Sequence, residues 1–166
     1  MKRVLITGMS GTGKSSVITK LAGRGYKAVD LDYNDYSELV ELDGAESKTG
    51  VAQEWRWRED RVSELLAADD GDILFVSGTA SNQSKFYPRF DHVVLLTVSD
   101  ALMSERLATR TNNPYGKEPA ELARQLKLKP RVEGWLRKVA DLEIDTSAPL
   151  DEVVAAILGL VSSGRA

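Results

Sequence analysis

The sequence predicts an α/β fold in which a five-stranded parallel sheet is covered by helices on both faces. Short β-branched runs alternate with helical patterns along the 166 residues, and parallel strands need such crossovers between them. The composition agrees, because 42% hydrophobic and 28% charged residues are typical of a globular protein. The length is that of one domain, so we expect residues 1–166 to fold as a single unit.

Five segments have the pattern of buried strands. They are Arg3 to Thr7, Lys27 to Asp30, Asp72 to Ser77, His92 to Val98 and Asp141 to Asp145. In a parallel sheet, ligands bind at the carboxyl ends of the strands, so the residues that follow these segments are the candidates for function. His92, the single histidine, begins a strand and is therefore expected at the opposite edge.

Helical periodicity fills the intervals between these strands. It covers Lys14 to Ala22, Tyr36 to Leu42, Val51 to Ala68, Ala101 to Arg110, Ala120 to Ala140 and a last segment behind Pro149. We expect Pro130 to break or kink the fifth of these helices, because proline removes a backbone donor and clashes with the preceding turn. The last helix is the clearest, with apolar residues at helical spacing as far as Val161.

The composition also limits the partners. The absence of cysteine excludes disulfides, thiolate zinc sites and cysteine nucleophiles. With 22 Lys and Arg against 25 Asp and Glu, the net charge of -3 offers no electrostatic footprint for nucleic acid or an anionic membrane. The apolar runs are far shorter than the roughly 20 residues of a membrane span. We therefore expect a cytoplasmic protein, a monomer or a homodimer, whose partner is a small molecule.

The segment after the first strand, Gly8-Met9-Ser10-Gly11-Thr12-Gly13-Lys14-Ser15, fits the phosphate-loop pattern G-x-x-x-x-G-K-S/T. The ammonium of Lys14 is expected on the β and γ phosphates, and the hydroxyl of Ser15 on the magnesium ion that bridges them. The glycines let backbone N–H groups turn inward around a phosphate. The predicted nucleotide contacts are Gly8, Ser10, Gly11, Thr12, Gly13, Lys14, Ser15 and Ser16.

With this loop, an Asp-x-Asp after the second strand, an arginine-bearing helix after the fourth and a terminal helix, the chain resembles the small P-loop kinases. This is the adenylate, shikimate and gluconate kinase group, and the resemblance covers nearly the whole chain. It implies a three-layer P-loop NTPase fold with strand order 2-3-1-4-5 and a lid segment. It also implies ATP and Mg²⁺ as cofactors.

Asp30 and Asp32 are the second pair of candidates. Alternation in an extended segment puts them on the same side, at the carboxyl end of a strand. The resemblance to shikimate kinases implies that Asp30 helps to hold magnesium and that Asp32 faces the acceptor hydroxyl. The alternative is that both carboxylates solvate the turn that follows.

Arg106 and Arg110 lie four residues apart and so share one face of a helix. The breaker-rich segment beyond them predicts a lid at about residues 111–119. In the family, lid arginines stabilise charge on the transferring phosphoryl group. Lys117 is a further candidate for a phosphate contact. The alternative for the two arginines is that they lie on a solvated helix face. In similar kinases the turn at Thr146 passes beside the adenine.

The acceptor site is less well marked. Trp55-Arg56-Trp57-Arg58-Glu59 resembles the Phe-Arg-x-x-Glu of shikimate kinases, which implies that Arg56 binds the acceptor. Helical spacing predicts that Trp55 faces the core and Trp57 faces outward, toward a substrate ring or another subunit. Gly78, Thr79 and Asn82 are candidates to line the pocket, although shikimate kinases carry a triple glycine there.

These observations predict an ATP-dependent small-molecule kinase that transfers the γ-phosphoryl group to a hydroxyl or phosphate acceptor. The expected catalytic residues are Lys14, Asp32, Arg106 and Arg110. One alternative is a nucleoside or nucleotide kinase of the same fold. Another is a nucleotide-binding regulatory ATPase module, in which lid closure acts as a switch.

Overall fold

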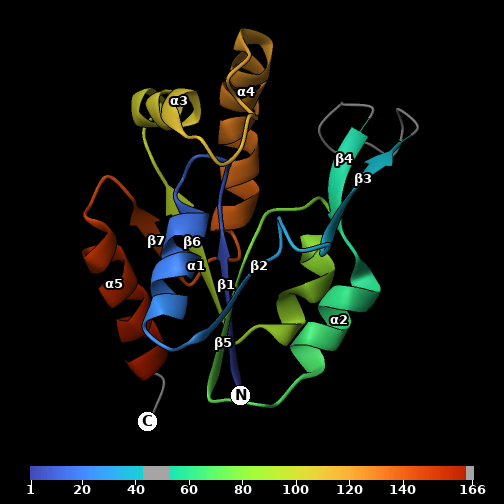
Figure 1. Ribbon diagram of the computed structural model, residues 1–166, viewed down its shortest axis with the longest axis vertical. Coiled ribbons are helices and arrows are strands. Elements are labelled where there is room, and N and C mark those ends of the chain that lie inside the picture. The colour runs from blue at the N-terminus through green and yellow to red at the C-terminus, as the bar shows by residue number, and fades with distance from the viewer. Residues whose placement is uncertain (43–52, 164–166) are drawn as a thin grey trace.

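The computed structural model describes residues 1–42 and 53–163, which form a central parallel sheet with helices around it (Figure 1). The strands are β1 (Lys2–Thr7), β2 (Lys27–Asp30), β5 (Ile73–Ser77), β6 (His92–Thr97) and β7 (Leu142–Asp145). Their spatial order is β2-β5-β1-β6-β7, and every neighbouring pair is parallel. Counted along the chain, this is the order 2-3-1-4-5, so the predicted sheet is confirmed.

Helices cover both faces of the sheet. Figure 1 shows α1 (Lys14–Gly23) and α5 (Leu150–Ser163) on one face, and α2 (Glu59–Ala67) with the 3₁₀ helix η1 (Gln83–Arg89) on the other. Alternation along β1 supplies both cores, because Val4 and Ile6 pack in the first and Leu5 in the second. The remaining helices, α3 (Asp100–Thr109) and α4 (Pro119–Arg137), extend beyond the carboxyl ends of the strands (Figure 1).

A β-hairpin replaces the helix predicted at Tyr36 to Leu42 and the first part of the helix predicted at Val51 to Ala68. The strands β3 (Ser37–Glu41) and β4 (Gln53–Trp57) pair in antiparallel register, and α2 begins only at Glu59. Both helix predictions are wrong here because each short run, which fits a helix or a strand about equally well, pairs with the other across the hairpin. Residues 51 and 52 of the second prediction lie outside the described residues.

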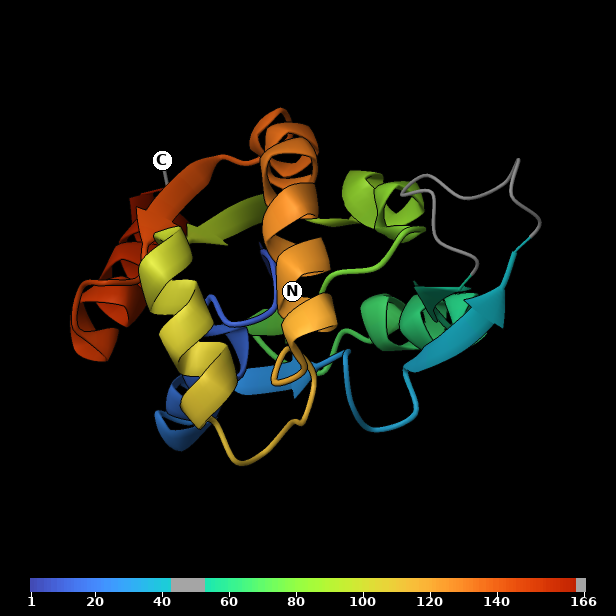
Figure 2. The ribbon, with the colours of Figure 1, turned by 90° about the horizontal axis from the view of Figure 1, so that it is seen from above.

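The prediction for the tryptophans is also reversed, because on β4 their burial depends on what each side chain packs against and not on helical spacing. Trp57 is 1% exposed and packs on Phe86 with ring centroids 5.8 Å apart, whereas Trp55 is 57% exposed. Trp55 pairs with Leu39 of β3, and both side chains are exposed. Figure 2 shows that the hairpin extends to the opposite side of the molecule from α3.

The helix α4 runs from Pro119 to Arg137 without a break at Pro130, so the predicted break is absent. Leu126 and Val132, on either side of the proline, both pack against the cluster around Met103. This packing holds the helix together across the missing backbone hydrogen bond. Within residues 1–42 and 53–163, no helix is both long and apolar enough to cross a membrane.

Candidate active site

The phosphate-loop sequence lies between β1 and α1 at the carboxyl edge of the sheet. Gly8 has a φ of +152°, and a Cβ at this position would lie 2.4 Å from the carbonyl oxygen of Leu96. Gly13 caps α1 in a left-handed conformation and brings no side chain to bond the first helical N–H groups. These amides therefore remain available to an anion at the helix N-terminus.

Lys14 lies inside this loop. Its ammonium donates to the carbonyl oxygens of Gly8 at 2.7 Å and Met9 at 3.0 Å, and the residue is only 8% exposed. Burial lowers the pKa of Lys14, and the carboxylates of Asp32 and Asp30 oppose that effect. The loop thus presents a positive charge at its centre, within reach of a bound phosphate.

Ser15 and Asp30 meet as the topology predicts. The hydroxyl of Ser15 donates to Oδ2 of Asp30 at 2.7 Å, which joins the start of α1 to the end of β2. Hard oxygen donors of this kind fit Mg²⁺, which keeps several waters and takes few protein ligands. Residues 1–42 and 53–163 contain no cluster of three or more His, Cys, Asp or Glu side chains that could hold a metal ion.

Asp32 follows β2, and its Oδ1 accepts a hydrogen bond from the amide of Thr79 at 3.3 Å. The residue as a whole is exposed, yet the surrounding protein desolvates its carboxylate. This burial raises the pKa of Asp32, while Lys14 opposes the rise. The arrangement places a carboxylate near the phosphate-binding ammonium, as phosphoryl transfer to a hydroxyl requires.

Thr79 connects this carboxylate to the phosphate loop. While its amide donates to Asp32, its hydroxyl donates to the carbonyl oxygen of Gly8 at 2.5 Å and lies 3.2 Å from the hydroxyl of Thr7. Gln83 extends the buried network, because its amide nitrogen donates to Thr7 at 3.3 Å. One threonine therefore fixes the two halves of the site relative to each other.

Arg106 is held beside the loop by Thr146 rather than left free. Its guanidinium donates to Oγ1 of Thr146 at 2.8 Å and to the carbonyl oxygen of Thr146 at 2.6 Å, with a longer bond of 3.4 Å to Gly11. The Thr146 hydroxyl in turn donates to the carbonyl oxygen of Thr12 at 2.7 Å. These bonds clamp the turn after β7 against the phosphate loop.

Arg110 belongs to the segment between α3 and α4, where the lid is predicted. Its guanidinium donates to Oγ of Ser10 at 3.1 Å and to the carbonyl oxygens of Asn113 and Tyr115 at 3.1 and 2.7 Å. Burial lowers the pKa of Arg110. The arginine therefore joins the lid segment to the phosphate loop, whereas the side chain of Lys117 is exposed.

On the acceptor side, Asn82 has a different place from the one predicted. Instead of lining a pocket, it is 8% exposed, accepts the amide N–H of Trp57 at 2.9 Å and donates to the Trp57 carbonyl oxygen at 2.9 Å. It thereby attaches β4 to the segment that follows β5. Gly78 lies next to Asp32 and Trp57, and Arg56 lies on β4 rather than on a helix.

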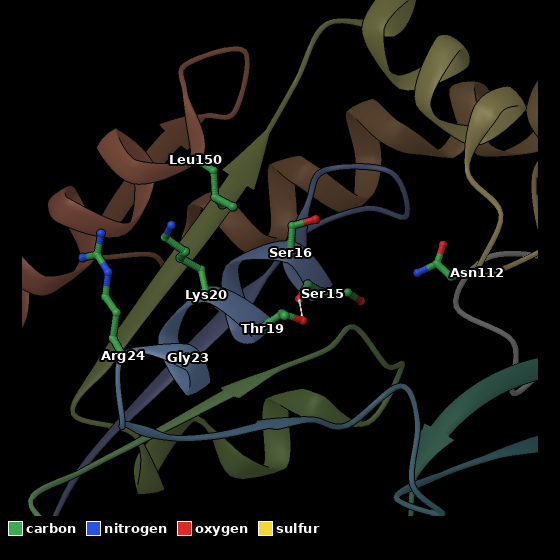
Figure 3. A pocket seen from close by; sticks show the side chains of 8 residues that line it. All are labelled: Ser15, Ser16, Thr19, Lys20, Gly23, Arg24, Asn112 and Leu150. Atoms are coloured by element: carbon green, nitrogen blue, oxygen red, sulfur yellow. Dashed lines mark hydrogen bonds between the residues drawn. The ribbon is translucent and has the colours of Figure 1, made fainter.

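A groove of about 590 Å³ runs from the phosphate loop along the outer side of α1. Figure 3 shows Ser15 and Ser16 at its head, with Asn112 of the lid segment on the opposite side. Its lining comprises Ser15, Ser16, Thr19, Lys20, Gly23, Arg24, Asn112 and Leu150. The groove offers space for a ligand that extends outward from the loop.

Two contacts at the site have no signal in the sequence. Gln125 of α4, which is 4% exposed, donates to the carbonyl oxygen of Ser10 at 2.8 Å. Tyr33, just after the second carboxylate, accepts a hydrogen bond from Asn113 of the lid segment at 3.3 Å. Both contacts depend on how distant elements pack, so neither spacing nor motif could have revealed them.

The solved structures that match this chain include small P-loop kinases. Shikimate kinase from Acinetobacter baumannii, solved with shikimate, has a TM-score of 0.66 at 19% identity over 99% of this chain and 95% of that chain. Shikimate kinase from Bacteroides thetaiotaomicron gives 0.66 at 16% identity over 97% and 98%. A gluconokinase from Sinorhizobium meliloti 1021 gives 0.59 at 20% identity over 99% and 98%.

These matches give the chain the fold of the small P-loop kinases that its sequence resembles. A search of curated proteins found no match. The model of one protein family, described as AAA domain, matches residues 4–127. That match covers well over half of the 166 residues, so the chain belongs to the AAA domain family.

Proposed function

We propose that the protein is an ATP-dependent small-molecule kinase, which transfers the γ-phosphoryl group to a hydroxyl or phosphate acceptor with Mg²⁺. The observation that carries this proposal is the assembly at one sheet edge of Lys14, the Ser15–Asp30 pair and Asp32. A phosphate-binding ammonium, hard oxygen ligands and a carboxylate are the groups that phosphoryl transfer uses. The kinase fold of the solved neighbours supports the same assignment.

Different residues of the chain have different roles in the proposed reaction. ATP supplies the phosphoryl group, and Mg²⁺ neutralises charge on its phosphates. Lys14 and the loop amides hold the triphosphate, while Ser15 and Asp30 hold the ion directly or through water. With a hydroxyl acceptor, Asp32 takes the proton as the acceptor oxygen bonds the γ-phosphorus and the bond to the β-phosphate oxygen breaks. Most of the rate enhancement comes from positioning and charge stabilisation.

The two arginines have separate roles in this proposal. Arg106 is a positioning residue, because its hydrogen bonds are to Thr146 and Gly11, and it keeps the turn after β7 beside the nucleotide. Arg110 exchanges its bond with Ser10 for a phosphate oxygen when the nucleotide binds. The groove along α1 receives the part of the nucleotide that extends from the loop.

The acceptor meets Asp32 and the residues around it. Arg56 is a cation on the hairpin, and its buried Nε has no hydrogen-bond partner among the described residues. It is therefore the group that would bind an anionic part of the acceptor, such as a carboxylate. Several classes of metabolite carry both a hydroxyl group and an anionic group, so the acceptor has to be found by a screen.

The experiment is to measure ADP formation from ATP and Mg²⁺ against hydroxylated metabolites, nucleosides and nucleoside monophosphates. The Lys14→Ala variant serves as the blank. We expect one acceptor class to raise the rate well above the acceptor-free rate, and Lys14→Ala to abolish it while the circular dichroism spectrum stays the same. Full phosphotransfer by Lys14→Ala would contradict the assignment.

A second candidate is a nucleotide-binding ATPase module without an acceptor, which the description of the matching family as AAA domain favours. Sedimentation with and without ATP distinguishes the two. Assembly on ATP, together with a slow rate that no acceptor accelerates, would favour the module. An unchanged oligomeric state with an acceptor-dependent rate would favour the kinase.

A further inference from the structure

Trp57 carries a buried hydrogen-bond donor that has no acceptor. The residue is 1% exposed, and its Nε1 has no hydrogen-bond partner within residues 1–42 and 53–163. Buried indole N–H groups ordinarily find a partner, because an unpaired one loses its bonds to water without compensation. An orphaned donor in a native structure therefore needs an explanation.

The position of this donor is fixed by the fold. Asn82 bonds both the N–H and the carbonyl oxygen of Trp57, each at 2.9 Å. The indole ring packs on Phe86, with an angle of 56° between the ring planes. Because the backbone and the ring are both held, Nε1 points in one direction only.

Gly78 and Asp32 are neighbours of this nitrogen. A Cβ on Gly78 would lie 3.1 Å from Nε1 of Trp57 and 3.1 Å from Oδ1 of Asp32, so both atoms border the same small space. The carboxylate accepts one hydrogen bond from the described residues, the long one from Thr79 at 3.3 Å. An ionised carboxylate accepts several. An unpaired donor thus lies beside an acceptor with spare capacity.

We propose that the indole N–H of Trp57 donates to Oδ1 of Asp32 in the nucleotide-bound protein, which makes Trp57 a positioning residue for the acceptor site. This inference rests on the proposed kinase function. The bond forms by rotation of the Asp32 side chain, because Trp57 is held in place. Trp57 and Thr79 then fix Oδ1 from two directions, and Oδ2 is left to face the acceptor.

This arrangement narrows the acceptor class. When one oxygen of the carboxylate is fixed and the other is directed at the acceptor, the acceptor has to offer a hydrogen-bond donor to that second oxygen. A hydroxyl can donate, whereas a phosphate acceptor at neutral pH presents mainly negative oxygens and is repelled. The geometry therefore favours an alcohol over a phosphate as the acceptor.

The kinetic test compares Trp57→Phe with Trp55→Phe. Trp57→Phe keeps an aromatic ring against Phe86 and removes the N–H, while Trp55 is the exposed tryptophan of the same strand. With the acceptor found by the screen, we expect kcat to fall roughly tenfold or more in Trp57→Phe, the KM for ATP to stay the same and Trp55→Phe to match the wild type. An unchanged kcat in Trp57→Phe would overturn the proposal.

A second test needs neither acceptor nor turnover. The chain has three tryptophans, so the indole ¹H–¹⁵N signals are few, and Trp57→Phe assigns the relevant one. Adding Mg²⁺ and adenylyl imidodiphosphate should shift this signal and slow its exchange with water, and Asp32→Ala should abolish both effects. Trp55 and Trp135 are internal controls.

The outcomes separate the two proposals. If the analogue shifts the amide signals of the phosphate loop but the Trp57 indole behaves alike in wild type and Asp32→Ala, the contact is wrong and the kinase proposal stands. If the analogue shifts no signal, nucleotide binding fails and both proposals fall. If the indole responds but the acceptor screen finds no activity, the contact stands without the kinase.

Discussion

The surroundings of Asp32 determine how readily its carboxylate takes up a proton. Burial raises the pKa of Asp32 above the ordinary range of an aspartate, and Lys14 and the amide of Thr79 oppose that rise. The same ammonium is held by the carbonyl oxygens of Gly8 and Met9. A carboxylate with a raised pKa and a buried ammonium therefore occur together at this edge of the sheet.

Asp32→Asn should therefore separate catalysis from nucleotide binding. The amide keeps the shape of the side chain and can still accept from Thr79, but it cannot take a proton. We expect kcat to fall by about 10²–10⁴-fold, with little change in the Kd for ATP. Initial rates and calorimetric titration with ATP measure the two quantities. Equal losses in rate and affinity would contradict a role on the acceptor side.

At the level of helices and strands, Asn82 makes two of the hydrogen bonds that attach the β3–β4 hairpin to the segment after β5. Asn82 satisfies the N–H and the carbonyl oxygen of Trp57, as a neighbouring strand would. The amide of Ser81 also donates to the carbonyl oxygen of Trp55 at 3.1 Å, so a second residue of β4 is bonded to the same segment. The hairpin holds Trp57 beside Asp32, so this attachment matters to the site as well as to stability.

Asn82→Ala leaves two buried main-chain groups of Trp57 without partners, which costs about 1–3 kcal/mol of unfolding free energy. We expect a lower denaturation midpoint and a red shift of the tryptophan fluorescence, because Trp57 gains contact with water. Lys85→Ala removes an exposed ion pair with Glu59 and is the matched control, with little expected change. Equal midpoints for Asn82→Ala and Lys85→Ala would show that the amide does not hold the hairpin.

The hairpin also marks the limit of prediction from sequence at this scale. The strands of the central sheet could be predicted because each is a β-branched run between clear helical patterns. The five residues of β3 and of β4 fit a helix or a strand about equally well, and only their mutual pairing decides between them. Pairing between distant segments cannot be read from either segment alone.

For the whole molecule, the sheet order made part of the site predictable. Ser15 and Asp30 follow two strands that end at the same edge, so their meeting at 2.7 Å follows from topology. The bonds of Arg106 to Thr146 and of Gln125 to Ser10 join elements far apart in the chain. They depend on side-chain packing across α3, α4 and the turn after β7, which no motif records.

The stability of the whole molecule should depend on pH through Glu133 of α4. Its Oε1 is buried without a hydrogen-bond partner among the described residues. Burial raises the pKa of Glu133, and the nearby Lys129 and Arg137 oppose the rise while Glu143 and Asp100 add to it. The folded state thus favours the protonated acid, and stability falls as the pH rises from the unfolded pKa of about 4.3 through the higher folded pKa.

Glu133→Gln removes this penalty and should raise the unfolding free energy at pH 7 by on the order of 1 kcal/mol, a shift of about 2–4 °C in Tm. Below pH 4 the advantage should disappear, because Glu133 is then protonated in both states.

Glu143→Gln is the matched control of opposite sign. Arg137 lowers the pKa of Glu143, so the ionised Glu143 stabilises the folded state above the unfolded pKa, and this stabilisation is lost in acid. That variant should be less stable at pH 7, by at most about 1 kcal/mol. Urea unfolding of both variants from pH 3 to 8 measures the two trends, and a gain in Glu133→Gln that does not vary with pH would mean that the buried charge is not its cause.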